Sequence, residues 1–243
     1  MTELSQEHSA NRLRAYVEDV VRTDIHRLAE IRHEPEVIRH LITALARSTA
    51  REVTYRTLTA DLRAVAPTIS EETVSNYLDL LKRLFIIETQ LPWAPELRSR
   101  ARVRKSAKFH LLDPALAAAV LGASSQHLRA DLQTLGLLFE SAVIHDLTVI
   151  ASSMGGEVRH YRDSNNKEMD AVIILPDRRW AAIEIKLGGG QVSAGVASLR
   201  KAISQIDTQA VGEPEFSLVV TGTGPVVVTD EGTITTPLRS LVS

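Results

Sequence analysis

Apolar residues recur at three- and four-residue steps near the start of the chain. In residues 12–31 these apolar positions are Leu13, Val17, Val20, Val21, Ile25 and Leu28. This spacing gives one apolar stripe along a helix, and the charged residues of the segment fall on the opposite face. A second run with the same spacing follows Pro35, a residue that the first turn of a helix tolerates. The pattern therefore predicts two amphipathic helices.

From residue 54 the pattern predicts two shorter helices, residues 58–65 and 70–85, separated by a turn at Pro67. Thr68 and Glu71 have the spacing of a capping box. Apolar residues line one side of the second helix, at Val74, Tyr77, Leu78, Leu81 and Leu84. This arrangement is typical of a helix-turn-helix unit.

A basic alternating run follows the second of these helices. If it is extended, four arginines share one face of a β-ribbon, and two lysines follow them. The candidate nucleic-acid-binding residues are Arg98, Arg100, Arg102, Arg104, Lys105 and Lys108. The segment predicts the wing of a winged helix, with a local basic patch that can contact phosphates.

The start of the would-be recognition helix carries acidic residues, among them Glu71, Glu72 and Asp79. Carboxylates would face the phosphates there, which argues against base reading in the usual helix-turn-helix manner. Three interpretations stay open for this unit: sequence-specific DNA recognition, nonspecific nucleic-acid contact through the wing, and a protein-contact or structural role.

The hydrophobic pattern changes in the second half of the chain. After an Ala-rich helix at 114–121 and a polar segment at 122–131, residues 135–151 have helical spacing. Strand-like runs follow at 158–161, 169–175, 180–187, 216–221 and 226–228, with a helix at 194–206. We expect an α/β fold class with three ranges: an N-terminal helix and linker at 1–33, a winged-helix-like domain at 34–122, and an α/β domain at 123–243.

Composition narrows the class of protein. The 243 residues are 44% hydrophobic and 24% charged, as in an ordinary globular protein, and the net charge of −2 gives no global basic field. The chain has no cysteine, which excludes disulfides and thiolate metal sites and fits a reducing compartment. We expect a cytoplasmic protein with no membrane span. We also expect no ATPase phosphate-binding loop, since no lysine follows Gly188 to Gly190 at the required spacing.

Charged residues interrupt two apolar strands of the second half. The turn at 176–179 predicts an antiparallel hairpin. Alternation puts Asp170, Val172 and Ile174 on one face of the first strand, and Glu184 and Lys186 on one face of the second. In the hairpin Asp170 and Glu184 are then neighbours across the two strands, on the same face of the sheet. Two carboxylates this close repel each other unless a proton or a cation lies between them. The sequence therefore predicts a site for a hard divalent cation, Mg²⁺ or Mn²⁺.

Glu140 falls on the apolar stripe of the preceding helix, in step with Leu137, Ile144 and Leu147. A carboxylate on a buried face needs a partner. Glu140 is a candidate further ligand of the same metal. A structural alternative stays open, in which Glu140 pairs with Lys186 or Arg162, and the strand residues form a charge network without catalysis.

Asp170 followed by Glu184-Ile185-Lys186, with Glu140 on a preceding helix, resembles the PD-(D/E)xK motif of restriction-endonuclease-like folds. Nearly the whole chain also resembles an uncharacterised C-terminal region found behind the ATPase domain of many prokaryotic AAA-type ATPases. The stretches that carry this resemblance are residues 16–25, 73–85, Leu91-Pro92-Trp93, 108–121, Leu138-Phe139-Glu140 and 160–186. In this sequence no ATPase domain precedes the region, and the recognition helix is acidic.

The resemblance implies a restriction-endonuclease-like α/β domain behind a winged-helix-like module, and Mg²⁺-dependent hydrolysis of DNA phosphodiesters. Asp170 and Glu184 would hold the metal with the main-chain carbonyl of Ile185, Lys186 would position water or stabilise charge, and Glu140 would complete the site. The alternative is a noncatalytic binding module that docks an ATPase domain or subunit, or another partner. The sequence leaves the oligomeric state open.

Overall fold

A computed structural model describes residues 3–29, 33–95 and 106–241. Two compact units divide the chain: Met1–Thr89 with Ala107–Ser141, and Gln90–Ser106 with Ala142–Ser243. The units are interleaved along the sequence, because strand β1 (Ile87–Pro92) and helix α9 (Leu132–Ser153) each begin in the first unit and end in the second. Each unit is described separately below.

The first unit is mainly helical, as the periodicity predicts. Its helices are α1 (Glu3–Asp19), the π-helical turn η1 (Val20–Asp24), α2 (Ile25–Leu28), α3 (Pro35–Arg47), α4 (Tyr55–Leu62), α5 (Glu71–Arg83), α7 (Pro114–Val120) and α8 (Ser125–Ala130). Strand β2 (Lys108–Leu111), the first half of β1 and the start of α9 belong to the same unit. The apolar stripes of these helices meet in one core, in which Ile38, Leu41, Leu78 and Leu81 are fully buried.

Side-chain caps fix the starts of the two helices of the helix-turn-helix. Thr54 accepts a hydrogen bond from the amide of Thr57 at the start of α4, and Ser70 accepts one from the amide of Thr73 at the start of α5. The predicted capping box of Thr68 with Glu71 is therefore wrong. The Ser70 hydroxyl takes the role because α5 begins two residues later than that box requires.

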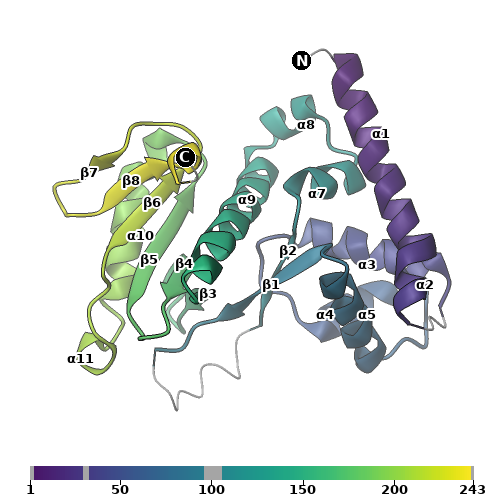
Figure 1. Ribbon diagram of the computed structural model, residues 1–243, viewed down its shortest axis with the longest axis horizontal. Coiled ribbons are helices and arrows are strands. Elements are labelled where there is room, and N and C mark those ends of the chain that lie inside the picture. Colours follow the sequence, from purple (N-terminus) through teal and green to yellow (C-terminus); the bar gives the residue numbers. More distant parts are fainter. Residues whose placement is uncertain (1–2, 30–32, 96–105, 242–243) are drawn as a thin grey trace. The chain divides into compact units, whose positions relative to one another are not determined.

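The second unit is an α/β sandwich. Its elements are β3 (Glu157–Arg162), β4 (Glu168–Ile174), β5 (Trp180–Lys186), the turn η2 (Gly189–Gln191), α10 (Val192–Ile203), α11 (Thr208–Val211), β6 (Ser217–Thr221), β7 (Val227–Val228), β8 (Ile234–Pro237) and the turn η3 (Leu238–Ser240). The second halves of β1 and α9 belong to the same unit. Figure 1 shows α10 alongside β5 and β6.

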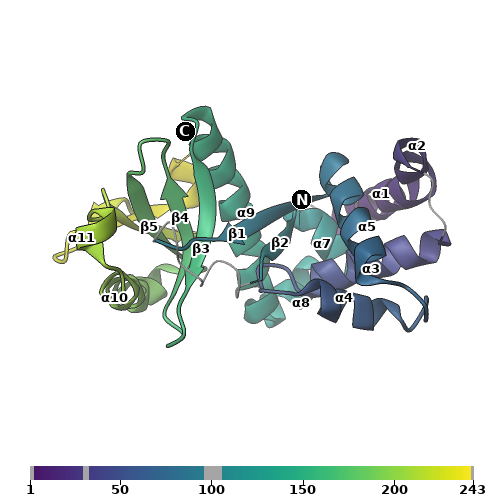
Figure 2. The same cartoon turned by 90° about the horizontal axis from the view of Figure 1, so that it is seen from below.

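The described strands form one mixed sheet in the order β2-β1-β3-β4-β5-β6-β8-β7. β3, β4 and β5 are antiparallel neighbours, whereas β1 with β3, β5 with β6 and β6 with β8 are parallel pairs. Helix α10 makes the crossover from β5 to its parallel partner β6, as parallel pairing requires. Figure 2 shows the β3 to β5 part of this sheet from below, with α10 against it.

Helix α10 covers one face of the sheet. Its buried residues Val196, Leu199 and Ala202 pack in one cluster with Val172 of β4 and Ala182 of β5. Gly195 allows the helix a close approach, because a Cβ at this position would lie 3.3 Å from Val219 and 3.4 Å from the Lys186 side chain. The face of β5 that holds Glu184 and Lys186 is therefore the face toward α10.

Helix α9 is apolar along its 22 residues. In the described part of the chain it is the one helix long and apolar enough to cross a membrane by length and composition, and a third of its most apolar stretch is buried. The expectation that no segment reaches this length and apolarity is therefore wrong for α9. The core helix of a soluble protein passes the same test, and α9 buries Val143, Ile144 and Leu147.

The predicted fold class is confirmed: a helical N-terminal part precedes an α/β region built on a mixed sheet. The sequence pattern also predicts β3, β4, β5, β6, β7 and α10 close to their observed bounds. It misses β1 and β8. Both are short, polar in part and end in a proline, at Pro92 and Pro237, so neither shows the apolar run of a buried strand.

Candidate metal and catalytic site

The β4–β5 hairpin brings the predicted strand residues together. The two strands pair antiparallel, with Ala171 opposite Ile183 and Ile174 opposite Trp180. The regular pairing ends at Ala171 and Ile183, one residue before Asp170 and Glu184. The expected antiparallel hairpin is thus confirmed.

A β-bulge in β4 lies at Asp170. Arg159 of β3 pairs with Val172, but Tyr161 pairs with Met169, so two residues of β4, Asp170 and Ala171, oppose the single residue between them on β3. Strict alternation therefore does not hold at Asp170. Bulges of this kind redirect a side chain and are common beside active sites.

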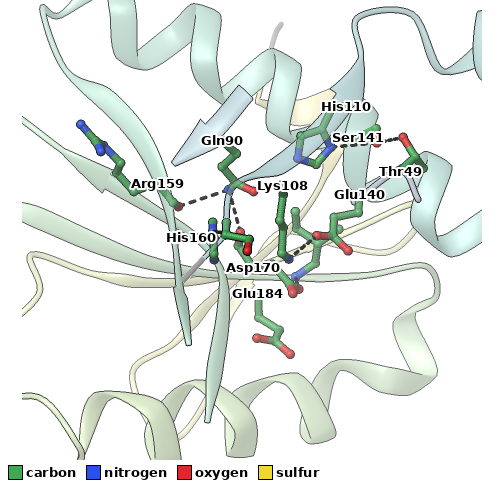
Figure 3. A network of polar contacts seen from close by, with 12 residues as sticks. Thr49, Gln90, Lys108, His110, Glu140, Ser141, Arg159, His160, Asp170 and Glu184 are labelled. Carbon is green, nitrogen blue, oxygen red and sulfur yellow. Dashed lines mark hydrogen bonds and ion pairs between the residues drawn. The ribbon is translucent and has the colours of Figure 1, made fainter. Parts of the chain in front are cut away.

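Gln90 fills the gap that the bulge leaves in the ladder. Its side-chain Nε2 donates to the carbonyl oxygen of Arg159 at 3.2 Å and to that of Asp170 at 2.8 Å, and the residue is 2% exposed. Figure 3 shows these two bonds converging on the Gln90 amide. Sequence reasoning missed Gln90, because its partners lie 69 and 80 residues away and no local pattern marks it.

The carboxylate of Asp170 binds the neighbouring strand. Its Oδ2 accepts a hydrogen bond of 2.8 Å from the amide nitrogen of Ile185. This bond links the bulge to β5 at the residue between Glu184 and Lys186. Asp170 is half-buried, and its charge acts directly on the Glu184 carboxyl group.

Glu184 is a buried carboxyl group with one oxygen partnered. The Lys186 ammonium lies 2.6 Å from Oε1, and Glu184 is only 5% exposed. Among the described residues, no group donates a hydrogen bond to Oε2. Figure 3 shows the Glu184 side chain running from its strand toward the helix beside it.

The surroundings of Glu184 raise its pKa to about 8. Burial is the largest cause, and the negative charge of Asp170 raises the pKa further. The charge and hydrogen bond of Lys186 and a weaker interaction with Ser198 of α10 act in the opposite direction. The carboxyl group is therefore mostly protonated at neutral pH, which relieves its repulsion from Asp170.

These donors fit a hard divalent cation. Mg²⁺ is commonly held by one or two carboxylates while it keeps several waters, so Asp170, Glu184 and the main-chain carbonyl of Ile185 are sufficient protein ligands. The unpartnered Oε2 of Glu184 is a donor oxygen that a cation would satisfy. In the described residues no cluster of three or more His, Asp or Glu side chains has metal-binding geometry.

Glu140 and Lys108 form an ion pair with each other inside the first unit. Lys108 Nζ lies 2.9 Å from Glu140 Oε1, and the two side chains are 3% and 14% exposed. The sequence correctly indicates that Glu140 needs a partner, and Lys108 is one that no local pattern marks. Lys108 is predicted at a nucleic-acid surface, and the structure instead buries it in β2. Figure 3 shows its ion pair with Glu140.

The other residues of the predicted basic wing lie outside the described part of the chain. These residues are Arg98, Arg100, Arg102, Arg104 and Lys105. The start of α5 is described, and there Glu71 and Glu72 are exposed, as their place on the helix predicts.

Comparison with known proteins gives two family matches. Residues 1–127 match the model of a domain of unknown function, DUF8612, and residues 135–241 match that of a second domain of unknown function, DUF4143. Searches of curated proteins and of solved structures each found no match.

Proposed function

The chain belongs to the DUF8612 family and carries a DUF4143 domain behind it, and from this premise we propose that it is a Mg²⁺-dependent nuclease with a PD-(D/E)xK-like site in its second unit. A DUF4143 domain is compatible with a region behind an AAA-type ATPase, so the proposed setting is a cytoplasmic protein that works with an ATPase domain or subunit. The observation that carries the proposal is the buried Glu184 carboxyl group, which has an unpartnered oxygen and both Asp170 and Lys186 as neighbours.

Each group has a role that follows from its position. Asp170 and Glu184 would hold Mg²⁺ with the carbonyl of Ile185, and the bound cation would polarise a phosphodiester and lower the pKa of a bound water. Lys186, 24% exposed at its side chain, lies 2.6 Å from Glu184 and would stabilise charge that develops on the phosphate. Mn²⁺ takes the same oxygen ligands and would replace Mg²⁺.

A plasmid-nicking assay with Mg²⁺ tests this proposal. Asp170→Asn, Glu184→Gln and Lys186→Met should each lower metal-dependent cleavage by at least 100-fold, because each removes a ligand or a charge at the reacting phosphate. Glu215→Gln is the matched control, since Glu215 is an exposed carboxylate of the same unit. Cleavage that persists in EDTA or in the three site variants would refute the proposal.

A second candidate function is a noncatalytic module that docks an ATPase domain or another protein. It is favoured by the exposed acidic start of α5, where Glu71 and Glu72 would repel phosphates. In that case Glu71→Gln with Glu72→Gln should weaken capture of a basic partner surface. No cleavage and no metal binding by the purified chain would favour this second function over the first.

A further inference from the structure

We propose that the second unit has a base-stacking pocket for one nucleotide of a single-stranded nucleic acid, at the opposite end of β4 and β5 from the candidate metal site. The pocket has a volume of about 270 Å³ and lies where β1 ends, beside the β4–β5 turn. Among the described residues that line it are Trp93, Trp180, Glu157, Arg159, Ile174 and Arg178. A volume of this size accommodates a single base, but no helix or strand of a partner.

The aromatic wall suits a flat ring. Trp93 packs against Trp180 with ring centroids 4.7 Å apart, and Tyr161 supports Trp93 edge-on at 6.1 Å. Trp180 is buried, and its Nε1 donates to the carbonyl oxygen of Gly212 at 3.1 Å, so its ring is held in place. The half-exposed Trp93 therefore offers a preorganised surface on which a base can stack.

The charge at the pocket suits an anion. Two arginines line it, together with one carboxylate, that of Glu157, which is bound to Arg159 at 2.7 Å. No carboxylate of the described residues forms an ion pair with Arg178. The neighbouring Asp177 is instead bound to Arg179 at 2.7 Å. Arg178 thus leaves a positive charge beside the aromatic wall, as a phosphate attached to a stacked base requires.

The backbone at Arg178 gives an independent reason to assign it a function. Its φ is +69°, in the left-handed region where glycine and asparagine are favoured and where other L-residues are strained by about 1–2 kcal/mol. The exposed Arg178 side chain lines the pocket. Strained residues of this kind cluster at ligand sites.

The position of the pocket allows one short single-stranded nucleic acid to occupy both the pocket and the candidate metal site. Ile174 and Trp180 pair at the pocket end of the hairpin, and Asp170 and Glu184 lie four residues further along each strand. Four residues of a strand span about 13 Å. An aromatic ring and a negative charge occur together in many ligands. That the ligand here is a nucleic acid rests on the proposed nuclease function.

Tryptophan fluorescence tests the pocket directly, since the only two tryptophans of the sequence are Trp93 and Trp180. The intact chain is titrated with a single-stranded oligodeoxyadenylate in EDTA, where no metal-dependent cleavage occurs. We expect the fluorescence to be quenched by the oligonucleotide, and an abasic oligonucleotide of equal length and charge to bind roughly 10-fold more weakly or worse.

Two variants separate stacking from charge. Trp93→Leu should weaken binding at least 10-fold, measured by fluorescence anisotropy of a labelled oligonucleotide, and Trp93→Phe should restore most of it. Arg178→Asn should weaken binding while the melting temperature stays the same or rises, because asparagine tolerates the left-handed backbone. Arg179→Gln removes the same charge one residue away, outside the pocket, and should leave binding within about twofold.

The outcomes distinguish this inference from the proposed function. Fluorescence quenching without any cleavage in Mg²⁺ would support the pocket and refute the nuclease. Metal-dependent cleavage with no quenching, with equal binding of the abasic strand, or with equal losses in Arg178→Asn and Arg179→Gln would overturn the pocket and leave the nuclease standing.

Discussion

At the scale of single residues, the two units handle buried charge in different ways. In the first unit Lys108 and Glu140 neutralise each other at 2.9 Å. In the second unit Glu184 pairs with Lys186 through one oxygen, and its pKa is raised to about 8, first by burial and then by the charge of Asp170. The first arrangement pairs opposite charges, whereas the repulsion between Glu184 and Asp170 is relieved by a proton or a cation.

The raised pKa of Glu184 predicts an unusual pH dependence of stability. Between pH 4.5, the ordinary pKa of a glutamate, and about pH 8, Glu184 keeps its proton in the folded state and loses it in the unfolded state. In that window the metal-free protein should therefore lose stability as pH rises, by up to about 1.4 kcal/mol per pH unit. Urea denaturation at pH 5.5, 6.5 and 7.5 measures this slope.

Glu184→Gln should remove that slope and leave the metal-free protein at least as stable as the wild type at pH 7.5, because glutamine carries no charge to bury. Saturating Mg²⁺ should flatten the slope of the wild type in the same way. An unchanged pH slope in the variant, or a loss of roughly 3 kcal/mol in it, would assign Glu184 to a structural network instead.

The Lys108–Glu140 pair should respond in the opposite way. Lys108→Met strands a buried carboxylate and should lower the free energy of unfolding by roughly 3 kcal/mol or more. The double variant Lys108→Met with Glu140→Leu should recover most of that loss, since no unpaired charge remains. Chemical denaturation of the single and double variants checks this, and equal stability of the two would show that the pair does not act as a unit.

At the scale of elements, the bulge in β4 determines where Asp170 points. Gln90 of β1 holds it by bonding the carbonyls of Arg159 and Asp170, and Asp170 in turn bonds the amide of Ile185. Contacts from β1, β3 and β5 thus hold Asp170 of β4 in position. Such support is what a metal ligand needs if it is to keep its position when the cation binds.

Gln90→Leu should therefore affect both stability and chemistry. Two buried carbonyls lose their donor, which should cost about 1–3 kcal/mol of unfolding free energy, and Mg²⁺-dependent nicking should fall at least 10-fold through misplacement of Asp170. Gln209→Leu, at an exposed position of the same unit, should change neither. Full nicking activity in Gln90→Leu at a temperature where it stays folded would contradict the positioning role.

The same elements show what the sequence can and cannot predict. The β4–β5 hairpin follows from local alternation and a turn, and so does the shared face of Glu184 and Lys186 on β5. The bulge does not, because it interrupts that alternation at Asp170, and Gln90 does not, because its partners lie 69 and 80 residues away. The Lys108–Glu140 pair is missed for a similar reason, since it joins a strand to a helix 32 residues further along the chain.

At the scale of the whole molecule, the interleaving of the two units limits how the chain can be cut. Residues 90–106 belong to the second unit although they precede most of it by about 40 residues. They supply the half of β1 that pairs with β3 through Leu91 and Pro92. A fragment that begins at residue 123, the predicted start of the α/β domain, lacks this strand and Gln90.

The 123–243 fragment should therefore unfold less cooperatively than the second unit of the intact chain and should have no Mg²⁺-dependent nicking activity. A synthetic peptide of residues 87–95 added in excess should raise its melting temperature, measured by circular dichroism, because the peptide restores the β1 pairing. A fragment with intact-chain stability and no response to the peptide would show that β1 is dispensable.

The most direct test of the central claim, that Asp170 and Glu184 hold a divalent cation, is titration calorimetry of Mg²⁺ into the metal-free chain at pH 7 in two buffers of different ionisation enthalpy. With a Glu184 pKa of about 8, binding should release close to one proton per cation, and both the binding and the proton release should be lost in Asp170→Asn and Glu184→Gln. Mg²⁺ binding that releases no proton, or that both variants retain, would contradict the account.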